Sequence, residues 1–283
     1  MTDFDERQDS PLFEAKRFGE PSVFTPDSLL SEARRQKDLP DDDVPDVCVL
    51  DPDGDIVRQL VATGRGEKDG TWPGYHTDLY RFSLDGDEVG IVGRAVGAPF
   101  AVLVAEQLFA SGCQFLVSIT SSGRIVPKDD PPYFVLIDRA LRDERASHHY
   151  ESPAQYATLP ADLQERVETA CQSVPRPVYT GATWTTDAPF RETEAAIQRA
   201  RDEGILAVEM EAAALYTFAA QRGCPVVCFA YVTNEMGQGD SEFEKGDANG
   251  SKATLEIIDA AITAWESGRR DPRSASGSPR DQI

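Results

Sequence analysis

Positive charge is scarce in this sequence. The 283 residues carry 49 acidic and only 28 basic side chains, which gives a formal net charge of -21. Residues 51–266 alone carry 34 acidic and 18 basic side chains, so the acidity belongs to the body of the chain rather than to a tail. Because binding to DNA or RNA depends on a basic surface, the composition argues against nucleic acid as a partner.

Histidines and paired cysteines are scarce as well. The sequence has three histidines and five cysteines, and no two cysteines form a CxxC pair. Zinc sites usually need such clusters. We therefore expect no metal site and read the cysteines that lie in or beside apolar runs as buried, reduced thiols.

Long apolar runs are missing too. No stretch of 18 apolar residues occurs, which excludes a membrane-spanning helix. The first residues, MTDFDERQDS, are acidic and lack the basic and then apolar order of a signal peptide. These two absences predict a cytoplasmic protein with no membrane partner.

The segments that are present alternate between strand and helix character without a break in composition. This alternation predicts an α/β fold, a single three-layer domain with a central mixed, twisted sheet flanked by helices. We expect that domain over residues 44–266, after an N-terminal arm with a short helix (1–43) and before a disordered Ser/Arg/Pro-rich tail (267–283). Strands are expected at 47–50, on both sides of a turn at Asp85-Gly86, and at 115–120, 133–141, 178–184 and 226–233; helices at 26–37, 56–62, 101–112, 161–174, 193–204, 208–223 and 253–267.

Polar and small residues follow several of the predicted strands, where an open α/β sheet places its ligands. They are SITSSGRI (118–125), TWTTDAPFRET (183–193) and YVTNEMGQGD (231–240). A fourth candidate is Glu209-Met210-Glu211, at the start of a predicted helix. Two carboxylates two positions apart cannot share a helix face, so one faces a site while the other caps the helix or is solvated.

Motifs for common cofactors and nucleophiles are absent. The sequence contains no GxGxxG, Walker or GxSxG motif, so dinucleotide binding and serine hydrolysis are disfavoured. No cofactor is expected.

The order of three segments resembles the nucleoside phosphorylase family, and among its members uridine phosphorylase in particular. These segments are VGRAVGAPFAVLVAEQLFASG (92–112), SITSSGRI (118–125) and AVEMEAAALYTFAAQRG (207–223) leading into CFAYVTN. The similarity extends from about Val44 to Glu266. It implies a mixed-sheet α/β domain that assembles as a homo-oligomer built from dimers, up to a hexamer.

The resemblance implies a sugar site around the VEMEAAALY segment. Glu211 falls on the carboxylate that binds the ribose 2′- and 3′-hydroxyls, Met210 on the residue that packs against the sugar, and Glu209 on its helical neighbour. A carboxylate that holds the ribose stabilises the oxocarbenium character that develops as the N-glycosidic bond breaks. Thr25 aligns with a residue lent to the sugar across a dimer interface.

The base site is implied by residues from two other segments. Phe190 aligns with an aromatic under the base, and Asn234 takes the position at which purine enzymes carry an aspartate, which favours the pyrimidine side. Glu235 is the ionisable neighbour of Asn234 and is either a replacement for that acid or a loop carboxylate. Only 18 residues separate Phe190 from Glu209, so the uracil-recognising insertion of uridine phosphorylase is absent and base specificity is left open.

The phosphate site departs from the family. Ser121 aligns with the hydroxyl residue that touches phosphate, in a predicted loop from Thr120 to Gly123 with exposed backbone N–H groups. Three family arginines are unmatched, and their positions hold Gly54, Ser118 and roughly Tyr75. Arg94, Arg124 and Arg191 lie near the same segments and either replace the missing arginines or form surface salt bridges.

Three functions are compatible with these residues. Phosphorolysis of a nucleoside to free base and ribose 1-phosphate ranks first, because it is the common activity of the family. A phosphate-independent nucleosidase is favoured by the missing arginines. A nucleoside-binding protein that has lost catalysis is the third.

Overall fold

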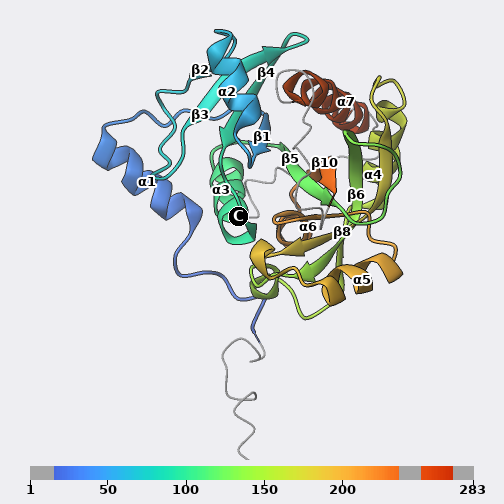
Figure 1. Ribbon diagram of the computed structural model, residues 1–283. Coiled ribbons are helices and arrows are strands. Elements are labelled where there is room, and N and C mark those ends of the chain that lie inside the picture. Colours follow the sequence, from blue (N-terminus) through green and yellow to red (C-terminus); the bar gives the residue numbers. More distant parts are fainter. Residues whose placement is uncertain (1–15, 236–249, 270–283) are drawn as a thin grey trace, which may run out of the picture.

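The sheet is the centre of the molecule and is covered by helices on both sides. The computed structural model describes residues 16–235 and 250–269, without the side chains of Asn234 and Glu235. Helix α3 packs against α6 on one side of the sheet, and α4 packs against α7 on the other, while α1 lies outside α3 (Figure 1). The α/β fold with a mixed sheet flanked by helices is therefore confirmed.

The helices and strands follow one another in near alternation. The helices are α1 (Pro26–Lys37), α2 (Asp55–Ala62), α3 (Ala98–Ala110), α4 (Ala161–Cys171), α5 (Glu194–Asp202), α6 (Ala212–Arg222) and α7 (Ser251–Arg269), with short 3₁₀ helices η1 (Ser147–His149) and η2 (Pro189–Arg191). The strands are β1 (Val47–Asp51), β2 (Glu67–Lys68), β3 (Leu79–Leu84), β4 (Asp87–Gly93), β5 (Phe115–Arg124), β6 (Tyr133–Asp143), β7 (Tyr156–Thr158), β8 (Val178–Thr186), β9 (Ala207–Glu209) and β10 (Val226–Glu235).

Part of the sheet closes on itself. The strand order is β10-β6-β8-β9-β5-β1-β4-β3-β2, and β10 also pairs with β5, so β5, β10, β6, β8 and β9 form a ring. Strands β1, β4, β5 and β10 run parallel to one another, whereas β9 is antiparallel to β5 and β6 is antiparallel to β10. The carboxyl ends of β1, β4 and β5 therefore lie at one edge of the sheet.

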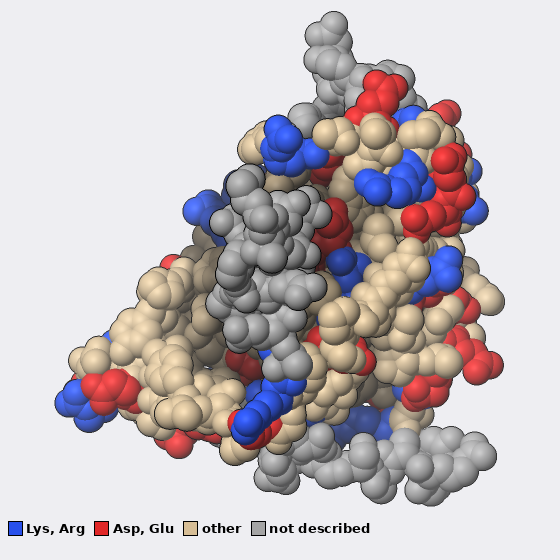
Figure 2. Space-filling view, turned by 90° about the horizontal axis from the view of Figure 1, so that it is seen from below, with Lys and Arg blue, Asp and Glu red and all other residues tan. Residues whose placement is uncertain are grey.

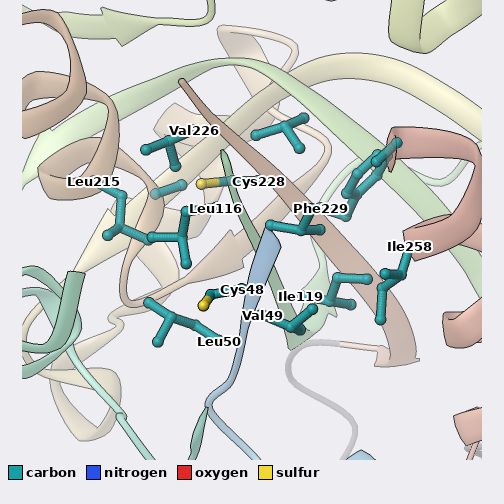
Figure 3. Packing of buried hydrophobic residues seen from close by; sticks show 14 of the residues in the cluster. Cys48, Val49, Leu50, Leu116, Ile119, Leu215, Val226, Cys228, Phe229 and Ile258 are labelled. Atoms are coloured by element: carbon teal, nitrogen blue, oxygen red, sulfur yellow. The ribbon is translucent and has the colours of Figure 1, made fainter. Parts of the chain in front are cut away.

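A continuous apolar core fixes this arrangement. Val49, Leu116 and Phe229 from three neighbouring strands are fully buried and pack with Leu215 of α6 and Ile258 of α7 (Figure 3). The cysteines Cys48 and Cys228 lie in the same cluster, which agrees with the prediction of buried thiols. Burial of this kind is the main stabilising contribution to the fold.

Most predicted elements are present within a few residues of their predicted ends, and two predictions at the candidate site are wrong. The predicted helix over 208–223 begins only at Ala212, because Glu209 belongs to strand β9 and Glu211 is the N-cap. The predicted loop from Thr120 to Gly123 is a continuation of β5, so most of its backbone groups pair within the sheet. The boundaries of arm, domain and tail stay predictions.

No helix in the described ranges 16–235 and 250–269 is long and apolar enough to cross a membrane.

Candidate active site

The candidate site is built from segments that follow the carboxyl ends of several strands. Hydrogen bonds connect the β1–α2 turn with β5, the β4–α3 loop with the N-terminus of α6, and β8 with β9. Ligands of α/β proteins usually bind at this edge of the sheet. The first question is what each of the two predicted carboxylates does there.

Both carboxylate oxygens of Glu209 are fully used in hydrogen bonds within the protein. One carboxylate oxygen accepts hydrogen bonds from the hydroxyls of Thr183 and Thr185, and the other accepts the N–H groups of Glu211 and Ala212, both at 2.7 Å. A helix begins with N–H groups that have no partner within the helix, and a carboxylate there is also favoured by the helix dipole. The Glu209 side chain therefore caps the N-terminus of α6, although the N-cap position itself is held by Glu211.

Glu211 is equally buried but has fewer partners. The residue is only 2% exposed, and one carboxylate oxygen accepts the N–H of Gly97 at 2.8 Å. The other oxygen accepts the N–H of Met210 at 3.3 Å. The Thr120 hydroxyl, which donates to the backbone oxygen of Ser121 at 3.4 Å, lies near the carboxylate and acts to lower the pKa of Glu211. A carboxylate has about four acceptor positions, so Glu211 keeps capacity for a ligand that Glu209 has lost.

The contact with Gly97 depends on an unusual backbone conformation. Gly97 has φ +89° and ψ 147° at the start of α3, a combination that only glycine adopts readily. This conformation turns the N–H of Gly97 towards Glu211. The GRAVG segment, which as a motif is only a weak Gly-rich turn, thus positions the central carboxylate.

The protonation of Glu211 follows from its surroundings. Burial and the nearby Glu209 carboxylate raise the pKa of Glu211 to about 8, against the opposing effect of its hydrogen bonds. Burial also raises the pKa of Glu209, but four donors favour its charged form. We assign the negative charge of the pair to Glu209, and the free protein holds Glu211 largely as the acid at neutral pH.

These shifts predict how stability depends on pH. Acids with a raised pKa in the folded state keep protons that the unfolded chain has already released, so the free energy of unfolding falls as pH rises through that window. Glu211 (about 8), Glu192 (about 7) and Asp51 (about 6) all act in this direction. Denaturant unfolding should show stability falling between about pH 5 and pH 8. Glu211→Gln should flatten the upper part of this decline, and an unchanged slope in the variant would contradict the assignment.

Ser121 has a partner that the sequence did not suggest. Its backbone N–H donates to a carboxylate oxygen of Asp53 at 2.9 Å. Asp53 lies in the turn between β1 and α2, just after a strand end, and a polar residue at that position is the sequence signal that points to it. The neighbouring Ser122 hydroxyl is buried and has no hydrogen-bond partner in the described structure.

The positions of the missing family arginines are filled differently. At Gly54, which has φ +74°, an added Cβ would lie 2.9 Å from Cγ of Arg94, so Arg94 covers the space that a side chain at 54 would take. Ser118 is buried within β5, and Tyr75 is part-exposed with its hydroxyl donating to Gln36 at 2.9 Å. Of the three replacement candidates, Arg94 is the one that lies against the β1–α2 turn.

The other two arginines lie elsewhere. Arg124 donates from its guanidinium to the backbone oxygen of Asp129 at 2.7 Å, and Arg191 is exposed in η2. In Figure 2 the acidic and basic side chains of the described residues that are visible on this face lie in small separate groups.

The other predicted ligand residues have different surroundings in this chain. Thr25 caps α1, where its hydroxyl accepts the N–H of Ser28 at 3.2 Å. Phe190 is 100% exposed in η2, so its predicted contact with a base stays a prediction. Asn234 and Glu235 end β10 beside Gly123 and Arg124, but their side chains lie outside the described residues.

A cavity formed by described residues lies at the other edge of the sheet. It measures about 460 Å³ and lies between the Asp85 turn, the end of α4 and α7, with Leu84, Val174 and Leu255 in its lining. The turn at Asp85 precedes β4, whereas Glu211 lies where β4 ends. We therefore base the site on the hydrogen bonds around Glu211 rather than on cavity size.

Comparison with known proteins agrees with the fold. The fold matches a uridine phosphorylase from Vibrio fischeri ES114, solved with 6-hydroxy-1-naphthoic acid, with a TM-score of 0.64 and 22% identity over 80% of this chain and 91% of that one. A guanosine phosphorylase of Halorubrum lacusprofundi is 22% identical over 64% of this chain and 75% of its own length. A DeoD-type purine nucleoside phosphorylase of Bacillus cereus is 28% identical over 62% and 77%. The model of the phosphorylase superfamily matches residues 46–263, and the chain belongs to this superfamily.

Proposed function

We propose that this protein is an enzyme that cleaves the N-glycosidic bond of a nucleoside. The observation that carries the proposal is the contrast between the two buried carboxylates: Glu209 has four protein donors, whereas Glu211 keeps acceptor capacity at the ligand edge of the sheet. The 2′- and 3′-hydroxyls of a ribose can donate the hydrogen bonds that the Glu211 carboxylate is still able to accept. The superfamily and its phosphorylase relatives support a nucleoside as the ligand.

The chemistry of Glu211 suits this reaction. When the C1′–N bond breaks, positive charge develops on the ribose ring, and a carboxylate that holds the 2′- and 3′-hydroxyls stabilises that charge more than it stabilises the neutral substrate. Within the proposal, Phe190 supports the base, and Asn234 with Glu235 faces the departing base. Phosphorolysis and hydrolysis share this departure of the base and differ in the group that attacks C1′.

The test of the proposal is release of free base from a panel of purine and pyrimidine ribonucleosides. Because each hydroxyl–carboxylate contact contributes about 1.5–3 kcal/mol, the 2′-deoxy and 3′-deoxy analogues should react with kcat/KM about 10- to 100-fold lower. The assays should be run with and without phosphate. They should also be run both in dilute buffer and in concentrated KCl, because salt screens the repulsion within a chain of net charge -21. Absence of base release from every nucleoside would contradict the proposal.

A homo-oligomer belongs to the same proposal. Val23 and Phe24 precede α1 and are 105% and 69% exposed, and Leu103 of α3, the helix against which α1 packs, is 41% exposed. Apolar side chains exposed in this way are typical of subunit interfaces. A partner subunit at this surface would also supply the neighbour to which the Thr25 arm is expected to reach.

A further inference from the structure

The N–H of Ser121 is a donor that the sheet leaves without a strand partner. Along β5, the N–H of Phe115 donates to the backbone oxygen of Asp46 on the β1 side, and the N–H of Leu116 donates to that of Pro225 on the β10 side. The N–H groups of odd-numbered β5 residues therefore point towards β1. The last β1–β5 pair joins Leu50 to Ser118, and β1 ends at Asp51. Ser121 therefore presents its N–H beyond the end of β1, where a ligand anion would be received.

The Asp53 carboxylate already occupies this position. Its oxygen lies 2.9 Å from the Ser121 nitrogen. The turn that carries Asp53 is held in place by the Asp51 carboxylate, which accepts the N–H groups of Gly54 at 3.0 Å and Val57 at 2.9 Å. These hydrogen bonds fix the backbone of the turn, and they therefore hold the short side chain of Asp53 next to Ser121.

Asp53 and Glu211 are neighbours of two consecutive residues of β5, Ser121 and Thr120. The N–H of Ser121 donates to Asp53, and the side chain of Thr120 lies beside the Glu211 carboxylate. The site therefore has one carboxylate for the sugar and a second one beside it, at the position of the expected anion. Glycoside-cleaving sites commonly use two carboxylates in this way, one of them to activate water.

The charges around Asp53 disfavour a phosphate co-substrate. An entering phosphate would have to displace the Asp53 carboxylate from Ser121 and then lie close to it, with Asp51 buried in the same turn. Among the described residues, Arg94 places its side chain beside Gly54, which stands at one of the three arginine positions that the family resemblance implies for a phosphate pocket. Like charges at short range repel strongly where water is partly excluded.

We infer that Asp53 fills the anion position at Ser121 and that the group attacking C1′ is water. The inference rests on the proposed nucleoside cleavage. The C1′–N bond breaks with its electron pair going to the base nitrogen, and a bond forms between C1′ and the water oxygen. The Asp53 carboxylate accepts a proton of that water and returns it to solvent, and the base nitrogen takes up one proton. The products are free base and free ribose.

Isotope and product analysis tests the identity of the attacking group. The full-length protein should release free ribose at a rate that does not depend on phosphate, and reaction in H₂¹⁸O should place the label at C1′. Ribose 1-phosphate formed only when phosphate is present would overturn the inference and leave the proposed cleavage standing. Absence of base release under all conditions would instead overturn the proposed function.

A matched pair of variants tests Asp53 itself. Asp53→Asn keeps an oxygen that can accept the Ser121 N–H but removes the proton acceptor, so the hydrolysis rate should fall about 10²- to 10⁴-fold with little change in Tm. Asp55→Asn is the control, because Asp55 pairs with Arg58 on α2 and its loss changes the charge of the same segment by the same amount. Full hydrolysis by Asp53→Asn, or an equal loss in both variants, would overturn the role of Asp53.

Discussion

Replacing Glu211 by glutamine is expected to lower kcat for nucleoside cleavage by about 10²- to 10³-fold, the usual effect of removing one group that stabilises transition-state charge. Glutamine keeps an oxygen for the N–H of Gly97, so the loop after β4 should stay in place. It cannot carry the negative charge that the oxocarbenium-like ribose requires. The measurement is steady-state kinetics on the ribonucleoside that the native protein cleaves fastest.

The pH profile separates this role from a structural one. Because the pKa of Glu211 is raised to about 8, kcat/KM of the native protein should increase with pH up to about that value as the carboxylate forms. The Glu211→Gln variant should lose this increase while its Tm at neutral pH is preserved. Native-like activity in the variant, or a rate loss that merely parallels unfolding, would contradict the assignment.

Replacing Glu209 by alanine is expected to lower the stability of the protein strongly, whereas replacing Glu211 by glutamine should lower its activity. The substitution leaves the N–H groups of Glu211 and Ala212 and two threonine hydroxyls without their buried acceptor. An unsatisfied buried donor costs about 1–3 kcal/mol, so the free energy of unfolding should fall by at least about 3 kcal/mol. Denaturant unfolding monitored by circular dichroism measures this loss.

Glu209→Gln is the matched control for the cap. Its amide oxygen can still accept the two backbone N–H groups, and the hydroxyls of Thr183 and Thr185 can rotate to accept from its NH₂ group. This variant should therefore lose much less stability than Glu209→Ala. Equal stability of the alanine variant and the native protein would show that Glu209 does not hold the start of α6.

Local patterns in the sequence were sufficient for most of the elements. The helix over 26–37 matches α1 residue for residue, because Thr25 and Ser28 form a capping box and basic residues end the helix. The Asp85-Gly86 turn joins β3 to β4 as predicted, since this dipeptide favours a tight hairpin. These features depend on neighbours within a few residues, which a sequence displays directly.

The start of α6 shows where local pattern was insufficient. The segment VEMEAAALYTFAAQRG has the composition of a helix throughout, yet its first residues extend β9 and pair with β8 and β5. Thr183 and Thr185 come from a distant part of the chain and fix Glu209 in that strand. Tertiary hydrogen bonds therefore overrode helix propensity here.

The sequence by itself determined that the chain is an acidic α/β protein of the phosphorylase type, with Glu211 as the candidate sugar ligand and without the usual arginines. Only the tertiary structure decided that the Glu209 carboxylate is fully hydrogen-bonded within the protein and that the Glu211 carboxylate can still accept hydrogen bonds from a ligand. It also placed Asp53 against Ser121, residues that lie 68 positions apart. The physical reason is that composition and spacing record which groups are present, whereas the partners that use up a carboxylate or an N–H come from segments that only folding brings together.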